Sequence, residues 1–260
     1  MPYITNSSVR TYYEEHGSGQ PVVFLHGFTL DRRMWRDQIP FLSNHFRLII
    51  QDARGHGLSD TPQSGYSRPD RISDVIALID HLGLPKVHLV GLSMGGSTAI
   101  GLALKHQERL LSMTLVDTGA AGFHIGKKIV RIDDIVRNKG LEAGKREWLR
   151  MTLMWYKGKR AIHADLMTSM VNEHSGAIWT DPMRGKYPPS PPDLDAVHTI
   201  SVPTCIFVGE KDAAFLPLAK KLHQRIAGSI YHEYADIGHM LNIESPDRFN
   251  HDLKAFLESC

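Results

Sequence analysis

VHLVGLSMGGSTAI, residues 87–100, changes character in its middle. An apolar run typical of a buried strand ends at Gly91, and a run of small residues typical of a helix begins after Ser93. On a very sharp strand-to-helix turn the apex residue has a strained backbone, and the residues two before and two after it crowd each other. Glycine at positions 91 and 95 leaves room for that crowding. The stretch therefore predicts that the Ser93 side chain projects from the apex, above the edge of a sheet.

A serine hydroxyl at such a turn is a candidate nucleophile, but it needs a base to remove its proton and a carboxylate to hold that base. The chain has 15 histidines, so their number does not select one. Their positions in the chain do select one, because the active groups of an open α/β sheet gather at the carboxyl ends of its strands. His239 follows the apolar run Ile230–Tyr234, and Asp212 follows the run Cys205–Val208. Asp117, at the end of another such run, is the alternative acid.

The rest of the chain alternates short apolar runs with helical stretches. That pattern is typical of the α/β class and predicts a mostly parallel sheet of about eight strands with helices on both faces. The predicted strands are Tyr3–Ile4, Val9–Tyr13, Val22–Leu25, Phe46–Ile50, Val87–Val90, Met113–Val116, Cys205–Val208 and Ile230–Tyr234. The predicted helices are Trp35–Leu42, Arg71–Leu82, Met94–Lys105, Leu218–Ile226 and Asp247–Leu257. The first two strands flank Asn6-Ser7-Ser8, which indicates an opening hairpin.

The alternation stops between residues 122 and 199. Helical stretches continue there without a clear strand pattern, and the segment closes with the extended Tyr187-Pro188-Pro189-Ser190-Pro191-Pro192. We therefore predict an α/β core formed by residues 1–121 and 200–260. Residues 122–199 are predicted to be a helical cap, inserted after the sixth strand and lying over the sheet.

Four further motifs stand in order along the chain: H-G-F at 26–28, D-A-R-G-H-G-L-S-D at 52–60, G-E-K-D at 209–212 and G-H at 238–239. With them the chain resembles the α/β-hydrolase superfamily over almost its entire length. The segment Leu30–Trp35, followed by D-A-R-G-H-G, resembles 3-oxoadipate enol-lactonase-like proteins and small-molecule esterases. The resemblance implies a catalytic triad of Ser93, Asp212 and His239, in that order along the chain. It favours Asp212 over Asp117 because the acid then lies in the G-E-x-D loop.

Two backbone N–H groups are expected to form the oxyanion hole, that of Met94 at the helix entry and that of Phe28 in the H-G-x loop. A single glycine precedes Phe28, whereas many lipases have H-G-G-G, and this argues against a lipase for bulky esters. We expect His26 to hold its own loop in place rather than to act as a second base. The polar side chains of the next motif are expected to tie down its turn; they are Asp52, Arg54 and His56.

The predicted reaction is hydrolysis of a small carboxylic ester or lactone through an acyl-serine intermediate. Two alternatives stay open. The same triad serves the hydrolysis of a carbon–carbon bond in a β-diketone, or a cofactor-free lyase step. A member of the fold that has lost catalysis would instead bind a small molecule in the same pocket.

Composition argues against several other classes of function. Basic residues exceed acidic ones by 30 − 28 = 2, which favours neither nucleic acid nor a membrane surface as a partner. No apolar run reaches the roughly 18–20 residues that span a bilayer, and the first residues lack the apolar core of a secretory signal. No metal-ligand spacing and no G-x-G-x-x-G motif is present, so neither a metal nor another cofactor is expected. Two cysteines form no disulfide framework, which suits a cytoplasmic protein, and no particular oligomeric state is predicted.

Residues 127–160 carry eleven Lys and Arg against four Asp and Glu. We favour a solvated helix face as the interpretation, and the excess also fits a field that attracts carboxylate-bearing substrates. The cap is rich in aromatic and methionine side chains, which we expect mostly to form its own core, with an adaptable acyl pocket as the alternative. They are Trp148, Trp155, Tyr156, Trp179, Met151, Met154, Met167 and Met170.

Overall fold

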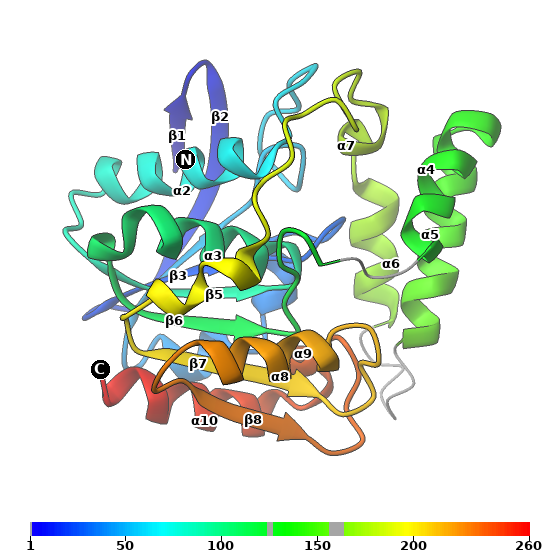
Figure 1. Cartoon of the computed structure of the whole chain (residues 1–260). Coiled ribbons are helices and arrows are strands. Elements are labelled where there is room, and N and C mark those ends of the chain that lie inside the picture. The colour runs from blue at the N-terminus through cyan, green and yellow to red at the C-terminus, as the bar shows by residue number, and fades with distance from the viewer. Residues whose placement is uncertain (1, 124–126, 156–163) are drawn as a thin grey trace.

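The computed structural model describes residues 2–123, 127–155 and 164–260. Its core is an eight-stranded sheet in the order β1-β2-β4-β3-β5-β6-β7-β8 (Figure 1). The strands are β1 (Tyr3–Asn6), β2 (Val9–His16), β3 (Pro21–Leu25), β4 (Arg47–Gln51), β5 (Val87–Leu92), β6 (Leu110–Val116), β7 (Thr204–Gly209) and β8 (Ile230–Tyr234). β2 runs antiparallel to both of its neighbours, and all the other pairs are parallel. The predicted mostly parallel sheet of about eight strands is confirmed.

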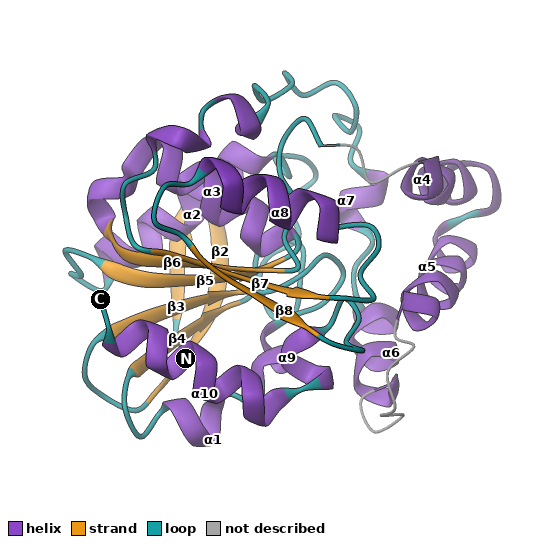
Figure 2. Cartoon of the chain, turned by 60° about the horizontal axis from the view of Figure 1, so that its bottom comes forward, coloured by secondary structure: helices purple, strands orange, loops and turns teal. Residues whose placement is uncertain are grey.

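Helices cover both faces of this sheet (Figure 2). On one face lie α2 (Arg68–His81), α3 (Met94–His106) and α8 (Leu216–Arg225), and on the other lie α1 (Ile39–Leu42), α9 (Leu241–Glu244) and α10 (Pro246–Glu258). Successive strand residues serve opposite layers, because side chains alternate across a strand. In β3, Val23 and Leu25 pack with the α2 layer, whereas Val22 and Phe24 pack with the α10 layer. Burial on both faces explains why the strands are near-continuous apolar runs.

The opening hairpin is formed by β1 and β2, with Asn6 paired to Val9. Ser7 and Ser8 make the turn, with φ values of 48° and 70°. Two central residues with positive φ give a turn whose twist matches that of the flanking strands. The predicted hairpin is confirmed.

Helix α2 begins one turn earlier than its apolar stripe predicts, at Arg68 instead of Arg71. The cause is a capping box. The Ser67 side chain accepts a hydrogen bond from the backbone N–H of Asp70, and the Asp70 carboxylate accepts one from the backbone N–H of Ser67. Pro69 in the first turn needs no hydrogen-bond acceptor for its nitrogen. The early start places Arg71 near the N-terminal end of α2.

The helix predicted over Trp35–Leu42 is wrong as a continuous element. The structure has a 3₁₀ helix, η1 (Arg32–Trp35), followed by the short α1 (Ile39–Leu42). Pro40 lacks an N–H group and its ring would clash with the carbonyl four residues before it, so one helix cannot run through it. The η1 helix starts early because the Asp31 side chain accepts a hydrogen bond from the backbone N–H of Arg33 at 2.9 Å.

The order of the central strands decides where a site can form. β3 lies between β4 and β5, so the chain crosses over β3 when it passes from β4 to β5. In open α/β sheets such a reversal leaves a crevice at the carboxyl ends of the two strands concerned. The H-G-F loop follows β3, and Ser93 follows β5. The topology therefore brings these two motifs to the same crevice.

In the described part of the segment between β6 and β7 lie the α-helices α4 (Lys127–Lys139), α5 (Leu141–Trp155), α6 (Ala164–Glu173) and α7 (Ala177–Thr180), followed by the short 3₁₀ helices η4 (Asp193–Asp195) and η5 (Val197–Thr199). Figure 1 shows the α-helices of this segment beyond the carboxyl ends of the strands, on the side to which the arrowheads of β6, β7 and β8 point. The predicted helical insertion after the sixth strand is confirmed. The division into a core of residues 1–121 and 200–260 and a separate cap of residues 122–199 stays a prediction.

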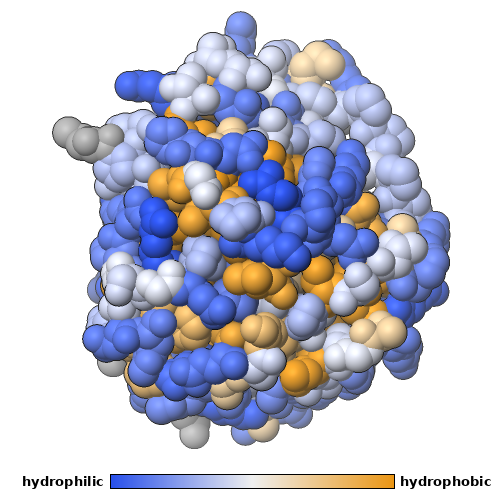
Figure 3. Space-filling model, turned by 90° about the vertical axis from the view of Figure 1, so that its left-hand side faces the viewer, coloured by the Kyte–Doolittle hydropathy of each residue, from blue (hydrophilic) through white to orange (hydrophobic). Residues whose placement is uncertain are grey.

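The side of the molecule away from this insertion is mixed in character. Hydrophobic side chains gather there in several groups, with hydrophilic ones between them (Figure 3). Across the part of the chain that the structure describes, every helix is too short or too polar to cross a bilayer.

A buried ion pair holds the turn after β4. Arg54 donates from Nε to Oδ2 of Asp74 at 2.6 Å and from Nη2 to Oδ1 at 2.7 Å, and the two side chains are only 6% and 3% exposed. Asp52 accepts hydrogen bonds from the backbone N–H groups of Arg32 and Leu58, at 2.7 and 2.9 Å. These contacts confirm that Asp52 and Arg54 tie down this turn.

Replacing Arg54 by Met should lower the free energy of unfolding by about 3–5 kcal/mol, because the Asp74 carboxylate is then left buried without its partner. The matched variant is Arg10→Met, which removes an ion pair to Asp60 from the surface, where Arg10 is 60% exposed and solvent screens the interaction. Urea unfolding of both variants measures the difference. Equal losses in the two variants would show that the buried pair has no special part in the fold.

Candidate active site

Ser93 occupies a strained turn between β5 and α3. Its φ of 53° and ψ of −107° are rare for a residue with a side chain. A Cβ atom at Gly91 would lie 2.5 Å from the backbone of Gly95, and one at Gly95 would lie 2.2 Å from the carbonyl oxygen of Leu25. Neither position accepts a side chain, so the chain can turn this sharply only with glycine at both. The predicted sharp turn with Ser93 at its apex is confirmed.

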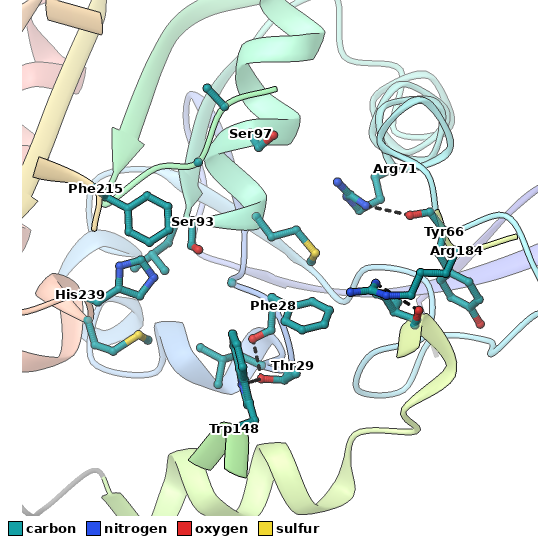
Figure 4. A pocket seen from close by; sticks show the side chains of 18 residues that line it. Phe28, Thr29, Tyr66, Arg71, Ser93, Ser97, Trp148, Arg184, Phe215 and His239 are labelled. Atoms are coloured by element: carbon teal, nitrogen blue, oxygen red, sulfur yellow. Dashed lines mark hydrogen bonds between the residues drawn. The ribbon is translucent and has the colours of Figure 1, made fainter. Parts of the chain in front are cut away.

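The loops after β7 and β8 bring Asp212 and His239 together. Nδ1 of His239 lies 2.7 Å from Oδ2 of Asp212, and both side chains are buried. Phe215 stacks on the imidazole, with ring centroids 4.6 Å apart and planes 19° apart. Figure 4 shows His239 at the same end of a cavity as Ser93, with Phe215 beside both. The contact with Asp212 and the stacking on Phe215 hold the imidazole in one orientation.

Asp117, the alternative acid, lies close to this pair but is held differently. Its Oδ1 accepts a hydrogen bond from the backbone N–H of Gly209 at 2.9 Å. Burial, and then the negative charge of Asp212, raise the pKa of Asp117 well above its usual value. Both causes disfavour the charged form of this carboxyl. The structure thus gives the contact with His239 to Asp212 and not to Asp117.

Ligand atoms of Asp117, Asp212 and His239 lie within 4.8 Å of one another, the one such cluster of metal-binding atom types among the described residues. A cation there would compete with the hydrogen bond between Asp212 and His239. It would also require Asp117 to lose its proton, against the raised pKa of that group. The residues therefore fit a metal poorly, and the absence of metals and other cofactors stays a prediction.

The two residues predicted to supply the oxyanion hole, Phe28 and Met94, both line the cavity with Ser93. Among the hydrogen bonds between described residues, neither backbone N–H has an acceptor. Thr29 connects the first of these positions to the insertion: its Oγ1 donates to the carbonyl of Phe28 at 2.6 Å and accepts from Nε1 of Trp148 at 2.7 Å. Two donors without partners are thus available beside the serine.

The histidines behind Phe28 hold loops. Nε2 of His26 accepts from the backbone N–H of Ala53 at 2.9 Å, while its Nδ1 lies 2.8 Å from the carbonyl of Gly27. Nε2 of His56 accepts from the backbone N–H of Thr29 at 3.3 Å, and burial lowers the pKa of His56 well below its usual value. A neutral ring with both nitrogens occupied cannot serve as a base. The expectation that His26 and His56 are structural is confirmed.

The cavity above Ser93 has a volume of about 330 Å³. Its described lining is mostly apolar, with a few polar side chains (Figure 4). The lining residues are Gly27, Phe28, Thr29, Leu30, Tyr66, Arg71, Leu92, Ser93, Met94, Ser97, Gly119, Ala120, Trp148, Ile178, Arg184, Phe215, His239 and Met240. Sequence reasoning missed Tyr66, Arg71, Arg184 and Phe215. For Phe215 a signal existed, because it lies three residues after Asp212 in a loop already placed at the site.

The described aromatic and methionine residues of the insertion are buried, but in a core shared with the sheet and not in a core of the insertion alone. Trp148 faces the cavity and packs edge-on against Phe28, with centroids 5.3 Å apart. Four others are buried in the hydrophobic core that the insertion shares with the α10 layer; they are Met151, Met167, Met170 and Trp179. The side chains of Met154, Trp155 and Tyr156 lie outside the described residues.

The basic residues of the stretch 127–160 are partly paired with acids. Arg137 pairs with Asp134, Lys145 with Glu142 and Arg150 with Glu147, each one helical turn apart. The exposed side chains of Arg137 and Arg150 support a solvated helix face, whereas Lys145 is buried. The other interpretation, a field that attracts carboxylates, stays a prediction, because six of the eleven basic side chains lie outside the described residues.

Comparison with known proteins gives consistent results. A family model described as "Alpha/beta hydrolase family" matches residues 22–252. The chain is 29% identical over 257 residues to the "Putative 2-succinyl-6-hydroxy-2,4-cyclohexadiene-1-carboxylate synthase" of Bacillus subtilis (strain 168), covering 95% of this chain and 93% of that protein. The solved enol-lactonase from Burkholderia xenovorans LB400 superposes with a TM-score of 0.87 at 26% identity, covering 99% of this chain and 100% of that one. A thermophilic esterase from Thermogutta terrifontis, solved with malate bound, gives a TM-score of 0.86 at 28% identity, covering 99% and 98%.

Asp212→Asn should lower kcat for a 4-nitrophenyl ester by about 10⁴-fold, because an amide can no longer hold and stabilise the charged imidazole. Asp117→Asn is the matched control: it makes the same chemical change a few ångströms away and should cost far less. Steady-state rates of the two variants decide between the acids. The reverse order of losses would assign the acid to Asp117.

Asp117→Asn should also change how stability depends on pH. The folded-state pKa of Asp117 is raised, so the wild type loses stability as pH rises from about 4 through that pKa, and an asparagine does not titrate. The melting temperature of the variant relative to wild type should therefore increase as pH rises above about 4. A constant offset between the two proteins at every pH would contradict a raised pKa of Asp117.

Proposed function

Because the chain belongs to the alpha/beta hydrolase family, we propose that it hydrolyses a small carboxylic ester or lactone through an acyl-serine intermediate on Ser93. The predicted resemblance to this family, and to enol-lactonases and esterases within it, is confirmed. The chain is an enzyme of hydrolase type. We propose both the substrate class and the roles of the individual site residues.

The first half-reaction forms the acyl-serine. Nε2 of His239 takes the proton of the Ser93 hydroxyl as Oγ attacks the carbonyl carbon, and the carbonyl electron pair moves onto oxygen. The backbone N–H groups of Phe28 and Met94 donate hydrogen bonds to that oxyanion. When the intermediate collapses, the bond to the leaving alkoxide breaks and the imidazolium gives it the proton. In a lactone the leaving oxygen stays attached to the acyl group through the opened ring.

The second half-reaction repeats these steps with water. His239 removes a proton from water, the hydroxide oxygen attacks the acyl carbon, and Ser93 Oγ leaves with the proton from the imidazolium. Asp212 is not itself protonated in either half. It orients the imidazole through Nδ1 and stabilises the ring while it is charged.

The observation that carries the proposal is the 2.7 Å contact between His239 and Asp212, placed at the end of a cavity that also exposes Ser93. The three residues come from the ends of β5, β7 and β8, so no local sequence effect accounts for their meeting. A volume of about 330 Å³ suits a small substrate better than a long acyl chain. The enol-lactonase and the malate-bound esterase among the solved relatives support a small ester or lactone.

A second candidate is a carbon–carbon bond reaction on the same triad. The relative from Bacillus subtilis is named as a synthase, not a hydrolase, although it matches 95% of this chain. A serine hydroxyl, an imidazole and two N–H donors suit both reactions, because each develops negative charge on a carbonyl oxygen.

Turnover of short-chain 4-nitrophenyl esters and small lactones, compared with vinylogous β-diketones, separates the two candidates. We expect ester or lactone hydrolysis by the wild type and a loss of at least about 10³-fold in Ser93→Ala, which removes the nucleophile. Circular dichroism of the variant checks that it folds. Diketone cleavage without ester or lactone turnover would favour the carbon–carbon reaction, and full activity of Ser93→Ala would overturn the nucleophile assignment.

A further inference from the structure

Two arginines, Arg71 and Arg184, line the cavity across from His239. Figure 4 shows their guanidinium groups on the side away from the imidazole, with Ser93 and Phe28 between. Among the described residues of the lining there is no Asp or Glu. The cavity therefore has a catalytic end and a cationic end.

Arg184 has its charge balanced. Its Nε and Nη2 donate to the two carboxylate oxygens of Asp133 in α4, at 3.0 and 2.7 Å, and Nη1 donates to the carbonyl of Ile178 at 3.3 Å. This fork-to-fork pair joins two parts of the insertion. Arg184 thus serves a structural purpose that needs no ligand.

Arg71 lacks such a partner. Its Nε donates to Oγ1 of Thr98 at 3.1 Å and its Nη1 to the carbonyl of Tyr66 at 3.0 Å, and both acceptors are neutral. A guanidinium carries five N–H groups, so three have no acceptor among the described residues. The charges of Asp70 and Asp74 act on Arg71 without forming an ion pair with it, and Asp74 is held in a bidentate pair by Arg54. Arg71 is thus a cation that faces the cavity and forms no ion pair with the described residues.

The surroundings of Arg71 disfavour its charge. Burial lowers the pKa of Arg71 to about 10, and the positive charge of Arg68 adds to the effect. Arg71 is partly buried, and a charge without an ion-pair partner is costly to a fold in such a place. An anion bound in the cavity would reduce that cost. The Nη2 group of Arg71 has no acceptor among the described residues, so it can donate a charge-assisted hydrogen bond to a carboxylate oxygen.

The hydrogen bonds of Arg71 place its guanidinium group relative to Ser93. Thr98, which accepts from Arg71, donates to the carbonyl of Met94 at 3.0 Å. Met94 directly follows the nucleophile, and Thr98 lies four positions further on, a rise of about 6 Å along the helix. The guanidinium therefore lies beside the first turn of α3. A short acyl chain is enough to connect the two ends of the cavity.

We propose that Arg71 binds a free carboxylate on the acyl side of the substrate, so that the enzyme prefers esters or lactones of short dicarboxylic acids. This inference rests on the proposed ester or lactone hydrolysis. In it, Arg71 is a specificity residue: one carboxylate oxygen accepts from Nη2 and the chain of the acid extends to Ser93. The neutral acceptors Thr98 and Tyr66 hold the guanidinium in place for this contact.

The test compares two substrates of equal acyl length, 4-nitrophenyl hemiglutarate and 4-nitrophenyl pentanoate, in wild type and in Arg71→Met. The ratio of their kcat/KM values should fall by about 30- to 100-fold in the variant, which corresponds to losing charge-assisted hydrogen bonds. Arg71→Lys keeps the charge without the fork and should give an intermediate ratio. A ratio that is the same in all three proteins would overturn the inference.

Arg137→Met is the matched control, since it removes one positive charge from an exposed position of α4 where the side chain is 72% exposed. It should leave the ratio near that of wild type. An equal fall in Arg137→Met and Arg71→Met would mean that a diffuse field, rather than a contact with Arg71, selects the anion. Melting temperatures accompany the kinetics, because a purely structural Arg71 would lower stability and reduce both substrates alike.

A binding measurement separates this inference from the proposed reaction. Calorimetric titration of Ser93→Ala with glutarate needs no turnover, and it should show binding that Ser93→Ala/Arg71→Met loses. If the wild type hydrolyses esters but Ser93→Ala and Ser93→Ala/Arg71→Met bind glutarate equally well, the anion site is refuted and the hydrolase proposal is unaffected. Arg71-dependent glutarate binding without turnover of any ester or lactone would refute the hydrolase proposal and leave the anion site standing.

Discussion

At Ser93 the chain passes from strand to helix with a φ of 53°, a conformation that costs a residue with a side chain about 1–3 kcal/mol. Such strain persists where the surrounding structure leaves no alternative. β5 is buried along its whole length between β3 and β6, and Gly91 and Gly95 let α3 turn back against it. The Ser93 N–H still bonds to the carbonyl of Val116, 3.0 Å away. Because strand and helix are both fixed, the hydroxyl has a fixed place relative to the loops after β7 and β8.

Near the Ser93 hydroxyl, residues of the same type differ in their roles because their surroundings differ. Asp117 and Asp212 are both buried, yet Asp212 contacts His239, while burial and its acidic neighbour raise the pKa of Asp117. The two aspartates thus take different roles. The same reasoning applies across the cavity, where Arg184 is neutralised by Asp133 and Arg71 is left for a ligand.

The sequence predicted those parts of the molecule that local chemistry imposes. The Gly91–Gly95 spacing located the sharp turn, and apolar runs located the central strands, which are buried on both faces. The prediction of one continuous helix over Trp35–Leu42 was wrong. The apolar pattern continues through Pro40, but proline cannot lie in the interior of a helix. Arg71 was not predicted because its partners, Thr98 and the Tyr66 carbonyl, depend on how α2 packs on α3. In the sequence alone, an arginine on a helix gives no sign of whether it faces solvent or a cavity. The nearness of Asp117 to Asp212 likewise depends on two strands far apart in the chain.

The central claim, that His239 activates Ser93 across the end of the cavity, is tested most directly with a fluorophosphonate probe and peptide mass spectrometry. The account predicts that one Ser93 per chain becomes covalently phosphonylated in the wild type, and that His239→Gln slows this labelling by orders of magnitude while leaving the fold intact. A folded wild type whose Ser93 stays unmodified, or equal labelling rates in the two proteins, would contradict it.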